Sequence, residues 1–257
     1  MIKSFIKIDK SFSELHKKVS QSFFGKISLK LLSEVLLALV IALAVYLGTA
    51  VYEYSKIESI ENENLNKLYI SVSNDYVESL FGEPYIKIQE SDSLQSQFYL
   101  LKDAVLRTVT ENDKVVAFFI TSKNAHRKIP ISTFYSGKQT IGKTNYFKVD
   151  FANPKIESNI EMNGRYCYYE EIQGTGRYAM YNYYLFATVS YGFVDNESVK
   201  LSEMYSINDS VSKESTDSLR KKAKPNTFGV IADGYEETVT LIPNVDGWQN
   251  IYYLLTK

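Results

Sequence analysis

The sequence predicts an α+β protein in which one N-terminal transmembrane helix precedes a β-rich, mostly antiparallel domain opened by a short helix. Three observations lead to this prediction. Residues 35–52 form an apolar run without a charged side chain. The residues after this run are rich in Tyr, Phe, Val, Ile and Thr, which favour strands. Residues 73–84 carry the start and stop signals of a short helix, with Gly82 and Pro84 at its end.

The apolar run is long enough to cross a lipid bilayer. Extending it back to Leu31 adds only one charged residue, Glu34. The extended helix measures about 33 Å at a rise of ~1.5 Å per residue, against a hydrocarbon core of ~30 Å. A buried core helix rarely runs so far without a polar face. A cleaved signal peptide has a shorter apolar region of about 7–15 residues, so residues 31–52 are better explained as an uncleaved signal anchor.

Charge differs on the two sides of this predicted span. Residues 1–30 carry seven lysines and two acidic residues, a net charge of +5, whereas residues 53–67 carry a net charge of −2. Cytoplasmic flanks of a span carry an excess of Lys and Arg. We therefore expect a basic cytoplasmic tail over 1–30, either an amphipathic helix on the inner leaflet or a disordered segment. The span would lie in the inner (cytoplasmic) membrane, the lipid bilayer would be a partner, and the domain would be extracytoplasmic.

The next two segments are predicted to be helical. Apolar residues three to five positions apart among polar ones indicate a helical stalk over residues 53–72. Ser73 or Asn74 can then cap a short helix by accepting hydrogen bonds from its free backbone N–H groups. The residues of this helix that we expect to face a sheet are Val77, Leu80 and Phe81.

Strand patterns fill much of the predicted domain, residues 73–257. The segment 115–121 is apolar on both faces, which predicts a central strand. Residues 123–142 are expected to be a loop or an edge region, and residues 202–224 a mobile excursion with at most one helical turn. Four of the five residues 220–224 are basic, which we interpret as a solvated charge cluster rather than a ligand site. The other predicted strands are 97–101, 104–110, 146–151, 165–172, 177–189, 228–232, 238–242 and 251–255.

Residues 73–121 resemble a known small module. A short helix that closes on Gly-x-Pro and leads into a strand meander is similar to the fold of the outer-membrane lipoprotein BamE and of the β-lactamase inhibitor proteins. The matching positions are Leu80, Phe81, Gly82 and Pro84. The resemblance implies a binding module without catalysis, and the lack of a lipid-anchor cysteine leaves a role in outer-membrane assembly unsupported. The chain also resembles uncharacterised bacterial single-span membrane proteins through Asn226-Thr-Phe-Gly229.

Residue types that carry catalysis are scarce in this chain. It has two histidines, His16 and His126, and one cysteine, Cys167, which excludes an intrachain disulfide and an ordinary His/Cys metal site. A Cys167–His126 nucleophile pair is conceivable, but a thiol within an aromatic strand is usually inert. Glu170 and Glu171 are adjacent on a predicted strand, so their side chains point to opposite faces and do not form a glycosidase pair. A net charge of −1 favours no nucleic-acid partner.

Tyrosines are concentrated in one predicted hairpin, over residues 166–191. Alternate residues of a strand share a face, so one face of the hairpin would cover the core and the other could present tyrosines. Tyrosine suits a partner surface because it offers a large area, few rotatable bonds and a polar tip. All of them could also be structural. The candidate binding surface, for a protein or glycan ligand or a second copy of the chain, comprises Tyr166, Tyr168, Tyr181, Tyr183 and Tyr184.

These features predict a membrane-anchored binding or sensing protein of the bacterial cell envelope, without catalysis, cofactor or metal. Two alternatives stay open. One is a membrane-associated effector of a bacterial defence or toxin system. The other is a membrane-anchored hydrolase, which would need a clustered Ser/His/acid or Glu/Asp site in the folded domain.

Overall fold

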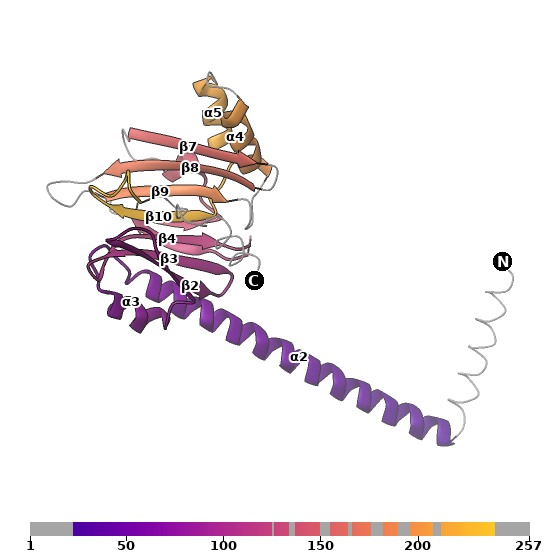
Figure 1. Cartoon of the computed structure of the whole chain (residues 1–257). Coiled ribbons are helices and arrows are strands. Elements are labelled where there is room, and N and C mark those ends of the chain that lie inside the picture. The colour runs from indigo at the N-terminus through magenta and orange to yellow at the C-terminus, as the bar shows by residue number, and fades with distance from the viewer. Residues whose placement is uncertain are drawn as a thin grey trace. The chain divides into compact units, whose positions relative to one another are not determined.

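The chain divides into two units, Met1–Ile57 and Glu58–Lys257. The computed structural model describes residues 23–124, 126–133, 137–149, 155–163, 166–175, 182–189, 196–207 and 212–239. Helix α2 (Phe23–Leu65) begins in the first unit and ends in the second (Figure 1). From Leu31 onward α2 is long and apolar enough to cross a membrane, and no part of its apolar window is buried inside the protein. The predicted order, an apolar N-terminal helix and then a mostly antiparallel α+β domain, is confirmed.

The second unit is built on one eight-stranded sheet in which every pair of neighbours is antiparallel (Figure 1). Two four-stranded meanders, β1–β4 and β7–β10, meet where β4 pairs with β10. Helices α4 and α5 are inserted between β9 and β10. In spatial order the strands are β1 (Ile86–Gln89), β2 (Leu94–Leu101), β3 (Ala104–Glu111), β4 (Lys114–Ser122), β10 (Thr227–Ala232), β9 (Asn182–Val189), β8 (Tyr166–Thr175) and β7 (Lys155–Asn163).

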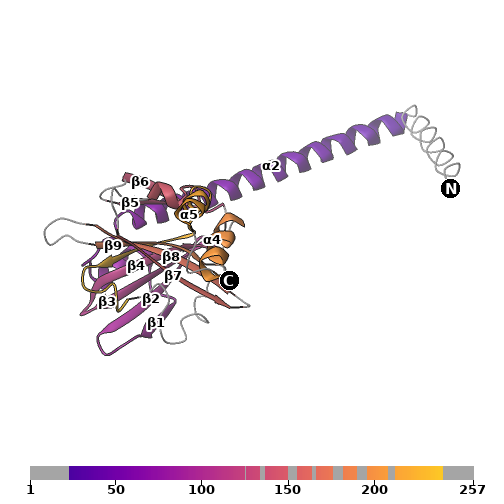
Figure 2. The same ribbon diagram turned by 90° about the horizontal axis from the view of Figure 1, so that it is seen from above.

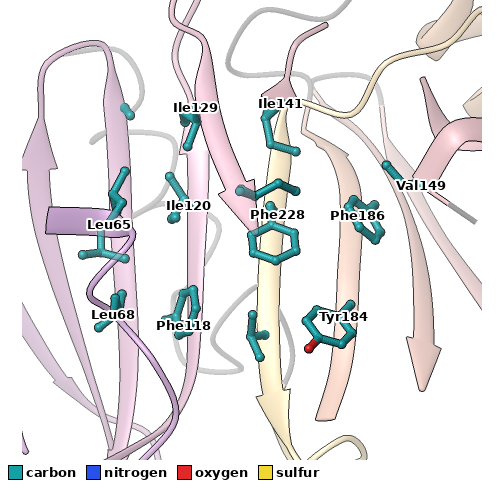
Figure 3. Close-up of a cluster of buried hydrophobic side chains, with 14 of the residues drawn as sticks. Leu65, Leu68, Phe118, Ile120, Ile129, Ile141, Val149, Tyr184, Phe186 and Phe228 are labelled. Atoms are coloured by element: carbon teal, nitrogen blue, oxygen red, sulfur yellow. The ribbon is translucent and has the colours of Figure 1, made fainter. Parts of the chain in front are cut away.

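One face of this sheet, which we call the covered face, packs against helices and a small hairpin (Figure 2). Phe118 and Ile120 of β4, Phe228 of β10 and Phe186 of β9 point into this layer, as Figure 3 shows. Leu65, from the last turn of α2, packs into the same cluster. Besides the end of α2, the covering elements are α3 (Asn74–Phe81), β5 (Ile129–Thr133), β6 (Gly137–Ile141), the 3₁₀-helix η1 (Tyr146–Val149), α4 (Asn196–Ile207) and α5 (Lys213–Arg220).

The opposite face of the sheet carries a second apolar cluster. Phe98, Phe119, Leu185 and Ile231 belong to it and are almost completely buried. Neighbouring residues of β4 therefore enter different clusters, since Phe118 lies on the covered face and Phe119 on the other. This confirms the prediction of a central strand that is apolar on both faces.

Helix α3 has the ends that its sequence predicts. The side chain of Ser73 accepts a hydrogen bond from the backbone N–H of Tyr76. Gly82 takes a φ of 79°, in the region that favours glycine, and its N–H donates to the carbonyl of Glu78 at 2.8 Å. Of the three residues expected to face the sheet, Val77 and Phe81 pack into the core cluster. Leu80 is half-buried and does not belong to it.

The second half of α4 and all of α5 stand where the sequence predicts a mobile excursion, residues 202–224, with at most one helical turn. Ser212 begins α5 by accepting a hydrogen bond from the N–H of Ser215 at 3.3 Å. Each helix contributes few apolar side chains to the core, so a helical period does not stand out in a segment rich in Ser, Asp, Glu and Lys. The apolar residues that these helices pack against the sheet are Leu201, Met204, Tyr205 and Leu219.

The predicted helical stalk over residues 53–72 is helical only as far as Leu65, where α2 ends. The other differences concern strands. Residues 146–149 form η1 rather than the start of a strand, because the Asn145 side chain accepts from the N–H of Lys148 at 3.0 Å and closes a turn. The region 123–142 contains the paired strands β5 and β6, and β1 and β7 were not predicted. Of the last two predicted strands, residues 238 and 239 follow a turn after β10, and the rest lie outside the described residues.

The pairing of β4 with β10 uses the motif Asn226-Thr-Phe-Gly229. Thr227 Oγ1 donates to Thr121 Oγ1 on β4 at 3.0 Å. Gly229 pairs with Phe119, whose ring occupies the space that a Cβ at position 229 would fill. We therefore interpret this motif as structural.

Replacing Gly229 with alanine is expected to destabilise the domain. The added Cβ would lie 2.4 Å from Cδ1 of Phe119 and 3.3 Å from the carbonyl oxygen of Phe118. Overpacking of this kind costs about 1–3 kcal/mol. Thermal unfolding of the full chain should show a lower midpoint for Gly229→Ala, and the double variant Gly229→Ala/Phe119→Leu should recover part of the loss. An unchanged midpoint for the single variant would contradict this packing.

Candidate functional site

The structure separates the predicted surface tyrosines. Tyr184 is 7% exposed and stacks on Phe228 with ring centroids 6.3 Å apart, so its ring is part of the core rather than of an exposed surface. Tyr183 lies on the opposite face, half-buried against the second apolar cluster. The side chains of the other three lie outside the described residues; these are Tyr166 and Tyr168, in β8, and Tyr181.

Asn226 ties together the ends of three strands. Its side-chain amide donates to the carbonyl of Val189 at 2.8 Å and accepts from the N–H of the same residue at 2.9 Å. Its own N–H donates to the carbonyl of Ala187 at 3.0 Å, and its carbonyl accepts from the N–H of Ser122 at 2.8 Å. Asn226 is buried, and through both its backbone and its side chain it holds β9, β10 and β4 together at one edge of the sheet.

A buried ion pair connects α5 to the sheet. The Arg220 guanidinium donates from Nε and Nη2 to the two carboxylate oxygens of Glu171, at 2.7 and 2.8 Å. The hydroxyl of Tyr169 donates to the same carboxylate at 2.5 Å. Burial, followed by the negative charge of Glu171, raises the pKa of Tyr169, so this hydroxyl stays protonated. We interpret the pair as structural, because its hydrogen bonds hold α5 and β8 together.

A second buried pair lies on the opposite face. Arg107 contacts Glu90 at 2.5 Å and donates from Nε to Ser96 Oγ at 2.7 Å. Its guanidinium also lies 5.3 Å from the ring centroid of Phe119 and 5.9 Å from that of Phe98. The aromatic rings and the carboxylate together stabilise a cation that would be costly to bury alone.

The third buried arginine, Arg127, holds the end of α2. Its Nη1 lies 3.0 Å from Glu58 Oε1 and its Nη2 donates to Glu61 Oε2 at 3.0 Å. The other oxygen of Glu61 accepts from the N–H of Lys102, in the β2–β3 turn, at 2.7 Å. Burial raises the pKa of Glu61 despite the Lys102 hydrogen bond and the Arg127 charge, which both lower it. These bonds fix residues 58–61 at the edge where β4 ends.

Lysines gather at this edge. Three chain segments meet there: the Gly142 N–H donates to the carbonyl of Pro225 at 3.1 Å, and the Nζ of Lys128 donates to the carbonyl of Gly142 at 3.1 Å. The segments 122–128, 139–149 and 219–225 contain no Asp or Glu. We call this surface the basic edge; its lysines are Lys123, Lys128, Lys143, Lys148, Lys221, Lys222 and Lys224.

The opposite edge of the sheet, where β4 begins and β10 ends, has the opposite charge. The hydroxyl of Tyr235 donates to Glu111 at 2.5 Å, which holds the turn after β10 beside the β3–β4 turn. This hydrogen bond, followed by burial, raises the pKa of Tyr235. We call this surface the acidic edge; its carboxylates are those of Glu111, Asp113, Asp233, Glu236 and Glu237.

The residues considered for catalysis or metal binding are dispersed. His126 is exposed in the β4–β5 connection, and Cys167 belongs to β8, with its side chain outside the described residues. Within the described ranges, no three side chains of His, Cys, Asp or Glu come together in a way that could hold a metal ion. The arrangement of the described charges suits recognition of a charged partner.

Comparison with known proteins gives only distant structural likenesses. No protein-family model and no curated protein matches the chain. One similar solved structure is an extracellular protein containing an SCP domain from Bacillus anthracis strain Ames, with 10% identity and a TM-score of 0.34. Another is a cysteine-rich secretory protein from Staphylococcus aureus strain Mu50, with 11% identity and a TM-score of 0.35. Each alignment covers 64% of this chain but only 44% and 45% of theirs, so this chain spans less than half of their length.

These findings correct the resemblance of residues 73–121 to BamE and the β-lactamase inhibitor proteins. The similar solved structures are SCP-domain and cysteine-rich secretory proteins, and nothing in the comparisons indicates the smaller module or the single-span family. The physical reason is that a short helix ending on Gly-x-Pro is a local signal. The meander that follows it here is one half of an eight-stranded sheet, completed by a pairing more than one hundred residues away.

The Glu171–Arg220 pair gives a test of the buried charges. Glu171→Gln should cost about 3–5 kcal/mol of unfolding free energy, because it removes the only fully buried carboxylate that the structure shows, among the described residues, bonded to the Arg220 guanidinium. The matched control is Asp217→Asn, since Asp217 lies 3.7 Å from the same guanidinium but is 32% exposed. It should cost less than about 1 kcal/mol. Urea unfolding of the full chain measures both, and equal losses would show that burial does not decide the effect.

Proposed function

We propose that this chain is a single-pass, membrane-anchored binding protein of the bacterial cell envelope, with its sheet domain outside the cytoplasm and without catalytic activity. The observation that carries the proposal is the exposed apolar surface of α2. Leu36 and Leu43 are 63% and 59% exposed, and the window around them has no buried share. Leaving a Leu side chain in water rather than in an apolar medium costs about 1.5–3 kcal/mol, so a bilayer is the environment that suits this helix.

Charge supports the orientation of the proposed anchor. The step from +5 over residues 1–30 to −2 over residues 53–67 follows the positive-inside rule. It favours a cytoplasmic N-terminus and a sheet domain on the other side.

The charge distribution of the sheet domain supports binding. Glu171 and Glu90, which are buried, are held by Arg220 and Arg107, so these groups serve the fold. Lysines predominate at one end of the β4–β10 pair, although Glu58, Glu61 and Asp103 also lie there, and carboxylates predominate at the other, beside Lys114. This separation suits electrostatic recognition of a partner. The tyrosine hairpin stays a predicted protein, glycan or self-association surface at Tyr166, Tyr168 and Tyr181.

The anchor can be tested by placing charge at the centre of α2. Leu39→Lys/Leu43→Lys should raise the free energy of membrane insertion by about 5–7 kcal/mol, at ~2.5–3.5 kcal/mol for each lysine. The variant should appear in the soluble fraction after alkaline carbonate extraction, whereas the native chain and the control Leu39→Ile/Leu43→Ile should stay in the membrane fraction. Extraction of the native chain would contradict the anchor.

The orientation has its own test. Protease added to intact spheroplasts should degrade the sheet domain and spare residues 1–30, as detected with tags at the two ends. Complete protection of the sheet domain would mean that it lies in the cytoplasm.

A further inference from the structure

The sheet domain begins at its basic edge. Glu61 of α2 is held there by Arg127. Residues 65–72 then cross the covered face, and at their end the N–H of Ser71 donates to the carbonyl of Val115 at 2.7 Å, where β4 begins. The chain therefore enters the domain at the basic edge and reaches the acidic edge only after crossing the sheet.

The predicted span ends close to this point of the chain. Tyr52 closes the uncharged run, and Glu58 is the first residue of the sheet unit. Helix α2 is continuous between them, and they lie less than two turns apart, about 9 Å at a rise of ~1.5 Å per residue. This length is close to the Debye length of about 10 Å at 0.1 M ionic strength, so charges near Glu58 remain within electrostatic range of a bilayer surface.

We propose that the basic edge is a docking surface for the anionic phospholipid head groups of the bilayer that holds α2. This inference rests on the membrane anchor proposed above and adds a second contact to it. Clusters of lysines beside a span are attracted to anionic lipids, each basic residue adding to the attraction. The contact would determine which edge of the sheet domain faces the lipid.

Phe147 gives the basic edge an apolar contact point. Its ring is 41% exposed, and the Nζ of Lys221 lies 4.9 Å from the ring centroid. The backbone around it is held in place, since the Asn145 side chain donates to the carbonyl of Lys221 and the Tyr146 N–H donates to that of Ala223 at 3.1 Å. An apolar ring among lysines is typical of surfaces that lie at the head-group boundary, where the ring enters and the ammonium groups pair with phosphate.

The charges on the two edges favour the same orientation. Burial, and then the ammonium groups of Lys224 and Lys143, lower the pKa of Lys128, as expected where three lysines converge. Anionic head groups would offset this repulsion. The acidic edge lies at the other end of β4, and the same head groups would repel it.

The experiment uses the full chain in lipid nanodiscs and measures the acetylation rate of each lysine by mass spectrometry. One set of discs contains phosphatidylcholine alone and the other contains added phosphatidylglycerol; neither lipid has a primary amine. In the anionic discs, acetylation of Lys143, Lys221 and Lys222 should slow by at least about fivefold. This factor is the gain in binding that one lysine obtains at an anionic surface. Lys87 and Lys114, which lie away from the basic edge, should keep their rates. High salt should remove the difference.

Two charge-matched variants test the residues. Lys143→Gln/Lys221→Gln/Lys222→Gln should lose the anionic-disc protection that the native chain shows at Lys148. Lys67→Gln/Lys87→Gln/Lys114→Gln removes the same number of exposed lysines elsewhere and should keep that protection. The native chain alone, compared between the two disc compositions and two salt concentrations, tests the inference even if a variant fails to fold.

The outcomes separate this inference from the anchor. A chain that enters neither type of disc overturns the anchor and this inference with it. A chain that enters both with equal acetylation at the basic edge overturns this inference alone. Protection by soluble polyphosphate in the zwitterionic discs, without protection by phosphatidylglycerol, would show a surface for a soluble polyanion and would also overturn bilayer docking.

Discussion

The antiparallel pairing of β4 with β10 is the constraint on which the sheet domain depends. It joins Thr121 to Thr227, 106 residues apart along the chain, and closing such a loop costs entropy that grows with the logarithm of its length. Local contacts must offset that cost: Asn226 ties β9, β10 and β4 together, and Gly229 lets the Phe119 ring pack against the neighbouring strand. Without this pairing each meander would end in an open edge strand at the centre of the present sheet.

The same pairing produces the two charged edges. Because β4 and β10 run in opposite directions, the connections after β4 and before β10 lie at one end of the pair, and those carry the lysines. The β3–β4 turn and the turn after β10 lie at the other end and carry the carboxylates. The whole chain has 29 basic and 30 acidic residues, so its net charge gives no sign that basic and acidic residues are separated in the fold. The strand topology produces this separation.

The parts that could be predicted from the sequence are those with a local signal. The central strand β4 was predicted because both of its faces are apolar, and the end of α3 because Gly82 and Pro84 mark it. Helices α4 and α5 were missed because they bury few apolar residues. The cluster 220–224 was interpreted as solvated, yet Arg220 is buried against Glu171. The lysines of this cluster form a larger basic surface only together with Lys128 and Lys143. These lysines come together only through tertiary contacts, so their spacing along the chain does not predict the surface.

Arg127 determines how the end of α2 meets this arrangement. Glu58 and Glu61 are three residues apart, so they share one face of the helix, and only one rotation of that helix brings both carboxylates to the same guanidinium. Leu65, in the last turn of α2, and Leu68, just after the helix, add apolar contacts, which are not directional. A buried ion pair adds little net stability, and its value here is specificity: it requires the chain to enter at the basic edge. One arginine between two glutamates therefore fixes the rotation of residues 58–61 on the sheet unit.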